Sequence, residues 1–233
     1  MGLIQKEITE YLQTIQPSFP GVLGEIHRDA LREGFPVAPP ETARLLAFLV
    51  TLTKPKNALE IGCAVGFSAS LIATNMAEDG KVTTMDRYAY MLARAYPNIE
   101  KMGLSDRITV LEGDAADILP TLTETYDFIF LDAAKGQYGR FMTDCLRVLK
   151  TGGILVADDV LQEGALARDR LDTPRRQRTT HTRMNGFLRE LSHTEGLETS
   201  IIPIGDGVAV AMKTQDNVVW KGGASDDDDD TDE

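Results

Sequence analysis

The sequence predicts an α/β fold in which a mostly parallel sheet of seven strands carries helices on both faces. From Asn57 onward, short apolar runs alternate with stretches of helical spacing, which is the pattern of βα units. The first apolar run, Ala58–Ile61, breaks at a glycine and opens a helix. Four of the predicted strands end in aspartate. Together these features indicate an open sheet with a ligand site beyond the carboxyl ends of its strands.

Three helices are expected before the sheet, over Leu3–Ile15, Gly21–Glu33 and Pro39–Leu52. The first helix stops before Pro17. The third helix begins at Pro39-Pro40, and proline is common in the first turn of a helix. We assign residues 1–55 to a helical cap over the sheet and residues 56–214 to the core. An acidic, disordered tail over 215–233 completes the predicted organisation.

The predicted strands and helices then follow one another without an internal repeat. The strands are Ala58–Ile61, Lys81–Asp86, Ile108–Asp114, Tyr126–Asp132, Gly153–Asp159, Thr199–Ile204 and Val208–Lys213. The helices start at about Gly66 and then cover Tyr88–Met102, a short stretch to Leu122, Tyr138–Leu149 and Thr180–His193. Gly205-Asp206-Gly207 separates the last two strands, so we expect a hairpin and an antiparallel final strand.

The composition is that of a globular protein, with 42% hydrophobic and 26% charged residues. No apolar run approaches the roughly 18 residues of a membrane span. The first residues lack the basic-then-apolar layout of a signal peptide. Cys63 and Cys145 are therefore expected to be reduced thiols in a cytoplasmic protein.

Most of the negative charge lies in the tail. The net charge is −12, but Asp226–Glu233 holds seven acidic residues and no basic one. Without that segment the chain has 29 acidic and 24 basic residues, a net charge of −5. A run of like charges is typical of a solvated, disordered segment, and the body of the protein is only mildly acidic.

The turn after the first strand has the chemistry of a nucleotide site. Gly62 and Gly66 allow close approach of a ligand to the backbone, and the following helix begins with unpaired N–H groups. The spacing G-x-x-x-G lacks the third glycine of the dinucleotide fingerprint, which disfavours a nicotinamide dehydrogenase. Glu60 precedes the turn by two residues. The alternative is an ordinary strand-to-helix turn without a ligand.

Two later strand ends extend this site. Asp86, at the end of the second strand, is suited to accept hydrogen bonds from ribose hydroxyls. Gly113-Asp114-Ala115, at the end of the third, is suited to the edge of an adenine. Asp114 has an alternative role, because an aspartate before a helix often caps it.

Asp132, Asp158 and Asp159 close the fourth and fifth strands, which we expect to be neighbours. Carboxylates converging at one place require a cation. An all-oxygen set fits Mg²⁺, with Mn²⁺ or Ca²⁺ as alternatives. Lys135 follows Asp132 by three residues and is a candidate general base, because a cation and its neighbours lower both pKa values. Otherwise it is a solvated loop lysine.

These motifs together resemble metal-dependent S-adenosylmethionine (SAM) O-methyltransferases of the catechol and caffeoyl-CoA type. The resemblance covers about residues 35–213, through Glu60–Ser68, Gly113–Ala115, Leu131–Lys135, Val156–Leu161 and Pro203–Val208. It implies a Rossmann-like SAM methyltransferase fold, a homodimer built partly from the N-terminal helices, and Lys135 as the base. It also implies metal ligation by Asp132, Asp158 and Asp159, where this family usually has Asn at the position of Asp159. Further expected contacts are Val37, Ala38, Gly62, Gly66, Ser68 and Asp132 to the cofactor, and Asp206 to the substrate.

The connector before the last helix favours one branch of this family. It is rich in arginine over Arg168–Arg189, and Asp132–Tyr138 together with this connector most resembles bacterial tRNA 5-hydroxyuridine methyltransferases. Arg175, Arg176 and Arg178 are candidate phosphate contacts. The leading expectation is methylation of a wobble 5-hydroxyuridine to 5-methoxyuridine. The alternatives are a small catechol, flavonoid or acyl-CoA phenol as acceptor, and a non-catalytic SAM-binding module.

Overall fold

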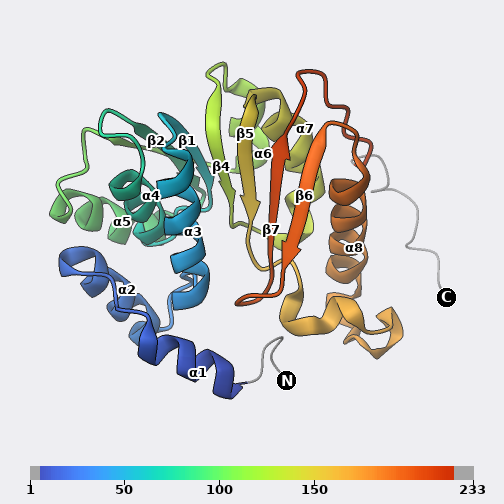
Figure 1. Cartoon of the computed structure of the whole chain (residues 1–233), viewed down its shortest axis with the longest axis horizontal. Coiled ribbons are helices and arrows are strands. Elements are labelled where there is room, and N and C mark those ends of the chain that lie inside the picture. The colour runs from blue at the N-terminus through green and yellow to red at the C-terminus, as the bar shows by residue number, and fades with distance from the viewer. Residues whose placement is uncertain (1–5, 223–233) are drawn as a thin grey trace.

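A computed structural model describes residues 6–222, and its seven strands form one sheet (Figure 1). The strands are β1 (Asn57–Ile61), β2 (Lys81–Asp86), β3 (Ile108–Glu112), β4 (Tyr126–Leu131), β5 (Leu149–Ala157), β6 (Leu197–Ile202) and β7 (Val208–Lys213). Their order is β3-β2-β1-β4-β5-β7-β6. The first five are parallel, whereas β7 runs antiparallel to β5 and β6. The predicted sheet and its antiparallel closing pair are confirmed.

Helices cover both faces of the sheet (Figure 1). The α-helices are α1 (Lys6–Ile15), α2 (Gly21–Glu33), α3 (Pro40–Thr53), α4 (Phe67–Asn75), α5 (Ala89–Lys101), α6 (Ala115–Ile118), α7 (Tyr138–Val148) and α8 (Arg178–His193). Short 3-10 helices are η1 (Leu119–Thr121), η2 (Lys135–Gln137), η3 (Gln162–Ala167), η4 (Arg170–Asp172) and η5 (Arg175–Gln177). No helix within residues 6–222 is long and apolar enough to cross a membrane.

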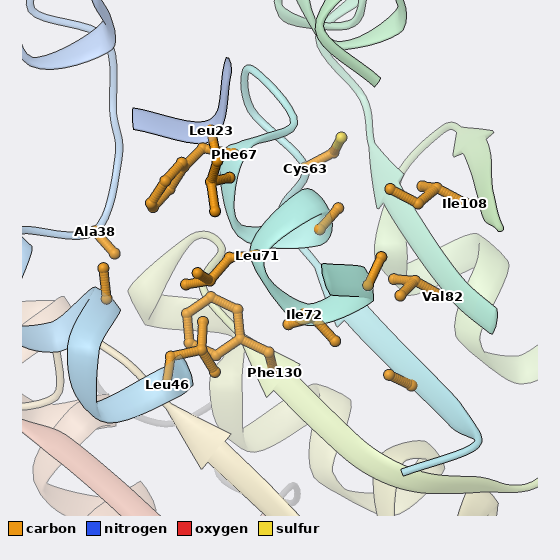
Figure 2. Close-up of a cluster of buried hydrophobic side chains, with 14 of the residues drawn as sticks. Leu23, Ala38, Leu46, Cys63, Phe67, Leu71, Ile72, Val82, Ile108 and Phe130 are labelled. Atoms are coloured by element: carbon orange, nitrogen blue, oxygen red, sulfur yellow. The ribbon is translucent and has the colours of Figure 1, made fainter. Parts of the chain in front are cut away.

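Alternation along the central strands builds two cores. Phe128 and Phe130 of β4 face the cluster that contains α2, α3 and α4, while Ile129 and Leu131 face the cluster beneath α7 and α8. Figure 2 shows the first cluster, in which Phe130 lies beside Leu46 of α3 and Leu71 of α4. Because successive side chains of a strand point to opposite faces, a strand apolar at every position is buried on both sides.

Strand and helix ends differ from the expected bounds for local reasons. β3 stops at Glu112 because Gly113 has φ +153° and the Asp114 side chain caps α6. β5 starts at Leu149, before the predicted Gly153, because Leu149 pairs with Tyr126 across a register shift. β3 is thus shortened by a turn and a helix cap, whereas β5 is lengthened by a pairing across a bulge.

The predictions for the two ends of the chain are only partly covered by the described residues. Residues 3–5 of the predicted first helix and the acidic run Asp226–Glu233 lie outside the described residues. The predicted disordered tail does not begin at residue 215, because Val218 and Trp220 pack against the second core and the Trp220 ring centroid lies 5.9 Å from that of Phe187. The division into cap, core and tail otherwise stays a proposal.

Candidate functional site

The turn after β1 brings the backbone against the end of β4. Gly62 has φ +108°, and a Cβ placed there would lie 1.9 Å from the carbonyl oxygen of Asp132. A backbone atom cannot yield as a flexible side chain can, so this approach requires glycine. Gly66 has φ +80° and immediately precedes α4 at Phe67. A Cβ at Gly66 would meet Ala95 at 3.3 Å, a milder contact.

A cavity of about 670 Å³ opens beside this turn, at the carboxyl ends of β1, β2, β3 and β4. Its volume lies within the usual range for small-molecule and cofactor sites. Several predicted residues line it: Gly62, Asp86, Gly113, Asp114, Ala115, Asp132 and Asp159. The predicted cofactor contacts Val37, Ala38, Glu60, Gly66 and Ser68 do not line it. The cavity is therefore built mainly by the strand ends.

Sequence reasoning missed part of this lining. Arg87, Tyr88, Tyr90 and Met91 follow β2, and Gln137, Arg140 and Phe141 lie at the start of α7. The only feature of the sequence that could have indicated these residues is their position just beyond the strand ends, because such residues face the same crevice.

Asp86 holds the walls of the cavity together. One carboxylate oxygen accepts a hydrogen bond of 2.8 Å from the Ala64 N–H, and the other accepts one of 2.9 Å from the Tyr88 N–H. The side chain thus joins the turn after β1 to the segment after β2. A carboxylate has about four acceptor sites, so these bonds leave capacity for the ribose contact that we predicted.

Asp114 caps α6, which is the alternative role considered for it from the sequence. It accepts a hydrogen bond of 2.9 Å from the Ala116 N–H, and its other oxygen lies 3.0 Å from Arg87 Nη1. The Ala116 N–H and the Arg87 guanidinium lower the pKa of Asp114. Asp114 still lines the cavity, and its predicted contact with adenine stays a prediction.

Glu60 lies sealed beneath the turn and accepts a hydrogen bond from the Thr84 hydroxyl. Burial raises the pKa of Glu60 to about 8, against the opposing effect of the Ser68 and Thr84 hydroxyls. Glu60 does not line the cavity, and its predicted contact with the cofactor stays a prediction.

Glu60 leads to a testable dependence of stability on pH. Its folded pKa of about 8 exceeds the ordinary value of 4.5, so the folded protein holds a proton that the unfolded chain releases. The free energy of unfolding should therefore fall as pH rises from about 5 to about 8. Glu60→Gln should flatten this slope and raise the melting temperature at pH 8 by several degrees. Thermal unfolding at a series of pH values tests this, and identical slopes in both proteins would contradict it.

The three predicted metal ligands directly follow the ends of the neighbouring strands β4 and β5. The Asp158 N–H donates to the Leu131 carbonyl at 3.0 Å, and the Asp159 N–H donates to Asp158 Oδ1 at 2.8 Å. Burial raises the pKa of both Asp132 and Asp158, and the charge of Asp159 raises each further. Mutual repulsion of this kind places the three carboxylates in one electrostatic cluster.

Lys135 contacts this cluster. Its Nζ lies 3.0 Å from Asp159 Oδ2 and 3.4 Å from Asp206 Oδ2. Burial opposes the ammonium charge, but the carboxylates of Asp159 and Asp206 outweigh it and raise the pKa of Lys135. In this arrangement the neighbouring acids stabilise the charged form of Lys135, and the lowered pKa that we expect beside a bound cation stays a prediction.

The three predicted metal ligands share one donor chemistry. All the predicted donor atoms are carboxylate oxygens, the ligands that Mg²⁺ and Ca²⁺ prefer. As the side chains stand, no three His, Cys, Asp or Glu between residues 6 and 222 are grouped so as to hold a metal ion. The donor chemistry suits such a cation, and its binding at this place stays a proposal.

A second cavity of about 370 Å³ adjoins Lys135 and Asp206. Its other wall is the connector between β5 and α8, which contributes Arg168, Thr173 and Gln177. Arg175 and Arg176 are exposed on this connector. Arg178 instead donates to the Thr173 and Leu171 carbonyls at 3.1 Å, so its first role is to hold the connector in shape.

Comparisons with known proteins agree with this geometry. Residues 35–214 match the family model described as O-methyltransferase. The chain is 32% identical over 181 residues to a caffeoyl-CoA O-methyltransferase of Populus kitakamiensis, covering 75% of this chain and 77% of that one. It is 30% identical over 187 residues to tricin synthase 2 of Oryza sativa subsp. japonica, covering 77% of this chain and 64% of the rice protein. The fold matches that of the SAH-bound methyltransferase PaMTH1 of Podospora anserina with a TM-score of 0.80, at 24% identity and covering 90% and 94% of the two chains.

Proposed function

The chain belongs to the SAM-dependent O-methyltransferases of the caffeoyl-CoA O-methyltransferase type, and we propose that it methylates an acceptor hydroxyl at the Asp132, Asp158 and Asp159 cluster. The observation that supports this most is that the larger cavity and the acidic cluster share two residues. Asp132 and Asp159 line the larger cavity and also belong to the acidic cluster. A methyl donor and a cation-bound acceptor would therefore meet at these two residues.

The larger cavity is the proposed cofactor site. SAM supplies an electrophilic methyl group when it is bound. We assign its ribose to Asp86 and its adenine to the Gly113–Ala115 segment, both of which line the cavity. Gly62 brings the backbone of the turn close to the ligand, and Pro36 borders the same space.

The acidic cluster is the proposed metal site. Asp132, Asp158 and Asp159 would hold Mg²⁺, with Mn²⁺ or Ca²⁺ as alternatives, and the cation would supply charge neutralisation that lowers the pKa of the acceptor hydroxyl. Lys135, within reach of Asp159 and Asp206, would hold or receive the acceptor proton. Positioning of the acceptor oxygen in line with the methyl group accounts for much of the expected rate.

The smaller cavity is the proposed acceptor site, and 5-hydroxyuridine in tRNA is our leading acceptor. The uridine 4-carbonyl oxygen lies next to the 5-hydroxyl and can chelate a cation as a catechol does. The exposed Arg168, Arg175 and Arg176 on the connector support this choice, because arginines near a pocket are suited to RNA phosphates. The second candidate is a small phenol, which the names of the plant relatives favour.

The connector arginines separate these two acceptors. Arg175→Ala with Arg176→Ala should reduce methylation of tRNA by about 10- to 100-fold. The plot of log binding constant for tRNA against log salt concentration should become less steep, by the amount expected for the loss of about two phosphate contacts. SAM binding and methylation of a small catechol should be unchanged. Arg178 is left intact because it holds the connector backbone.

Arg28→Ala with Arg32→Ala is the matched control. Both side chains are exposed on α2, and Figure 1 shows α2 on the opposite side of the molecule from the connector. An equal loss of tRNA methylation in this control would show a general charge effect. Efficient methylation of catechols by an enzyme that never methylates hydroxyuridine-containing tRNA would decide for the small phenol.

The expected homodimer stays a proposal, supported by the N-terminal helices. Residues Lys6–Ile15 form α1, in which no residue is buried, and Tyr11, Phe48 and Leu52 are large apolar side chains exposed on α1 and α3. Exposed apolar groups of this kind are typical of surfaces that bind another protein. Sedimentation of the full chain as a monomer at micromolar concentration would contradict it.

A further inference from the structure

The side-chain amide of Gln162 carries a hydrogen-bond donor that the protein does not use. Gln162 lies in the connector that follows β5, and its Nε2 is fully buried without a hydrogen-bond partner among residues 6–222. A buried donor without a partner is costly, so it calls for a specific reason in a native protein. Gln162 also lines the smaller cavity, together with Lys135 and Asp206. The unused donor therefore belongs to a residue of the proposed acceptor site.

The backbone around Gln162 has an uncommon conformation. Gln162 has φ +49° and Glu163 has φ +51°, in the left-handed region that few residues other than glycine adopt. Gly164 continues the same conformation with φ +78°. Backbone strain of this kind persists only where surrounding contacts fix it, and it clusters at segments that hold a ligand.

The turn between β6 and β7 supplies the contacts that fix this segment. The Leu161 N–H donates to the Asp206 carbonyl at 2.9 Å, and the Glu163 N–H donates to the Asp206 carboxylate. A Cβ at Gly207 would lie 2.4 Å from Leu161 Cγ, so glycine allows the turn to pack closely against the connector. Hydrogen bonds on both sides of Gln162 therefore hold its backbone at the wall of the cavity.

The lining of the smaller cavity suits a polar ring. It includes the hydrogen-bonding side chains of Thr173, Gln177 and Thr180, and none of the described residues that line it is aromatic or is Leu, Ile, Val or Met. Most small-molecule pockets are lined by hydrophobic and aromatic side chains. An apolar phenol ring would therefore find few apolar partners here, whereas a ring that carries carbonyl oxygens would find hydrogen-bond donors.

We propose that Gln162 is a specificity-determining residue, whose Nε2–H donates a hydrogen bond to a ring carbonyl oxygen of the acceptor. This role rests on the proposed function, because it places the acceptor in the smaller cavity. 5-Hydroxyuridine has ring carbonyl oxygens, whereas catechol has none. A site with a buried donor rejects an analogue that lacks the matching oxygen, because the donor then stays unpaired. Gln162 thus favours a hydroxylated pyrimidine over a simple phenol.

Gln162→Met tests this role, because methionine keeps an unbranched side chain and removes the amide. 5-Hydroxyuridine and catechol are titrated separately into the full-length wild type and variant, with SAH and Mg²⁺ present throughout, so that calorimetry measures binding without methyl transfer. The variant should bind 5-hydroxyuridine about 5- to 20-fold more weakly, while its affinity for catechol should stay within about twofold. Without an acceptor, its melting temperature should equal or exceed that of the wild type, because an unpaired buried donor has been removed.

Gln215→Met is the matched control. It makes the same change at an exposed glutamine after β7 that lines neither cavity, and it should leave both affinities unchanged. Gln162→Leu repeats the test if the methionine variant does not fold.

The contradicting outcomes separate Gln162 from the acceptor site. Equal weakening of both acceptors, or no weakening of either, would overturn the role of Gln162 and leave the acceptor site standing. A melting temperature several degrees below that of the wild type would likewise overturn it, because Gln162 would then serve the structure. A wild type that binds catechol alone would also overturn it. Failure of the wild type to bind either acceptor would overturn the acceptor site and the role of Gln162 together.

Discussion

Asp132→Ala is expected to reduce methyl transfer at least about 1,000-fold at any metal concentration, the equivalent of about 4 kcal/mol of lost transition-state stabilisation. Asp132 lines the larger cavity and belongs to the acidic cluster, so its loss removes a proposed cation ligand at the point where donor and acceptor meet. SAM binding should weaken much less. Steady-state kinetics at saturating Mg²⁺, together with SAM calorimetry, would separate these two effects.

Asp144→Ala serves as its control, because Asp144 pairs with Arg147 on α7 away from both cavities. Its activity should stay within about twofold of the wild type. Substantial turnover by Asp132→Ala with added Mg²⁺ would remove this residue from the metal site. Excess metal cannot restore a site that has lost one of its direct ligands.

Gly62→Ala is expected to weaken SAM binding at least about 100-fold. The added Cβ would lie 1.9 Å from the Asp132 carbonyl oxygen, and the residue would keep a φ of +108° that alanine tolerates poorly. The ends of β1 and β4 would have to separate, at a cost of about 2–4 kcal/mol in stability. Both the turn and Asp132 would shift, which damages the two sites at once. Calorimetric titration of SAM into the folded variant measures the effect.

Gly103→Ala isolates backbone strain from the steric clash. Gly103 has φ +67°, and nothing lies within 4 Å of the position that a Cβ would occupy. This variant should lose a smaller amount of stability and bind SAM normally. Undiminished SAM affinity in a folded Gly62→Ala would show that the turn after β1 is not part of the cofactor site.

The order of elements was predictable because its signals are local. Apolar runs, helical spacing and glycine or proline breaks each act within a few residues, and the strands found around Ala58–Ile61 and Tyr126–Leu131 follow them. The placement of Asp132, Asp158 and Asp159 at the ends of the neighbouring strands β4 and β5 was also predictable, because parallel strands end at one edge of the sheet.

Contacts that depend on three-dimensional packing were not predictable from the sequence. Glu60 is fully buried and accepts a hydrogen bond from the Thr84 hydroxyl of the neighbouring strand β2, a partner 24 residues away in sequence, while its expected place near the cofactor stays a prediction. Trp220 was assigned to a disordered tail, and it packs against Phe187 of α8. Neither partner is near in sequence, so no local pattern could report the contact.

The roles of Asp114 and Lys135 show how partners decide chemistry. A capping aspartate and a ligand-binding aspartate look alike in sequence, and the structure gives Asp114 the cap and the Arg87 ion pair. Lys135 pairs with two acids that are 24 and 71 residues away in sequence, and no local pattern predicts these two partners. Ion pairs of this kind form because loops that follow different strands lie side by side in the folded protein.

The most direct measurement of the central claim is a methyl-transfer assay with isotopically labelled SAM, with Mg²⁺ or with excess EDTA. Hydroxyuridine-containing tRNA and a small catechol are offered as acceptors, and mass spectrometry locates the labelled methyl group. We expect the label on an acceptor oxygen, with the 5-oxygen of the uridine as the favoured position, and we expect EDTA to abolish transfer and Mg²⁺ to restore it. Undiminished transfer in excess EDTA, or no label on any acceptor oxygen, would contradict cation-dependent O-methylation at Asp132, Asp158 and Asp159.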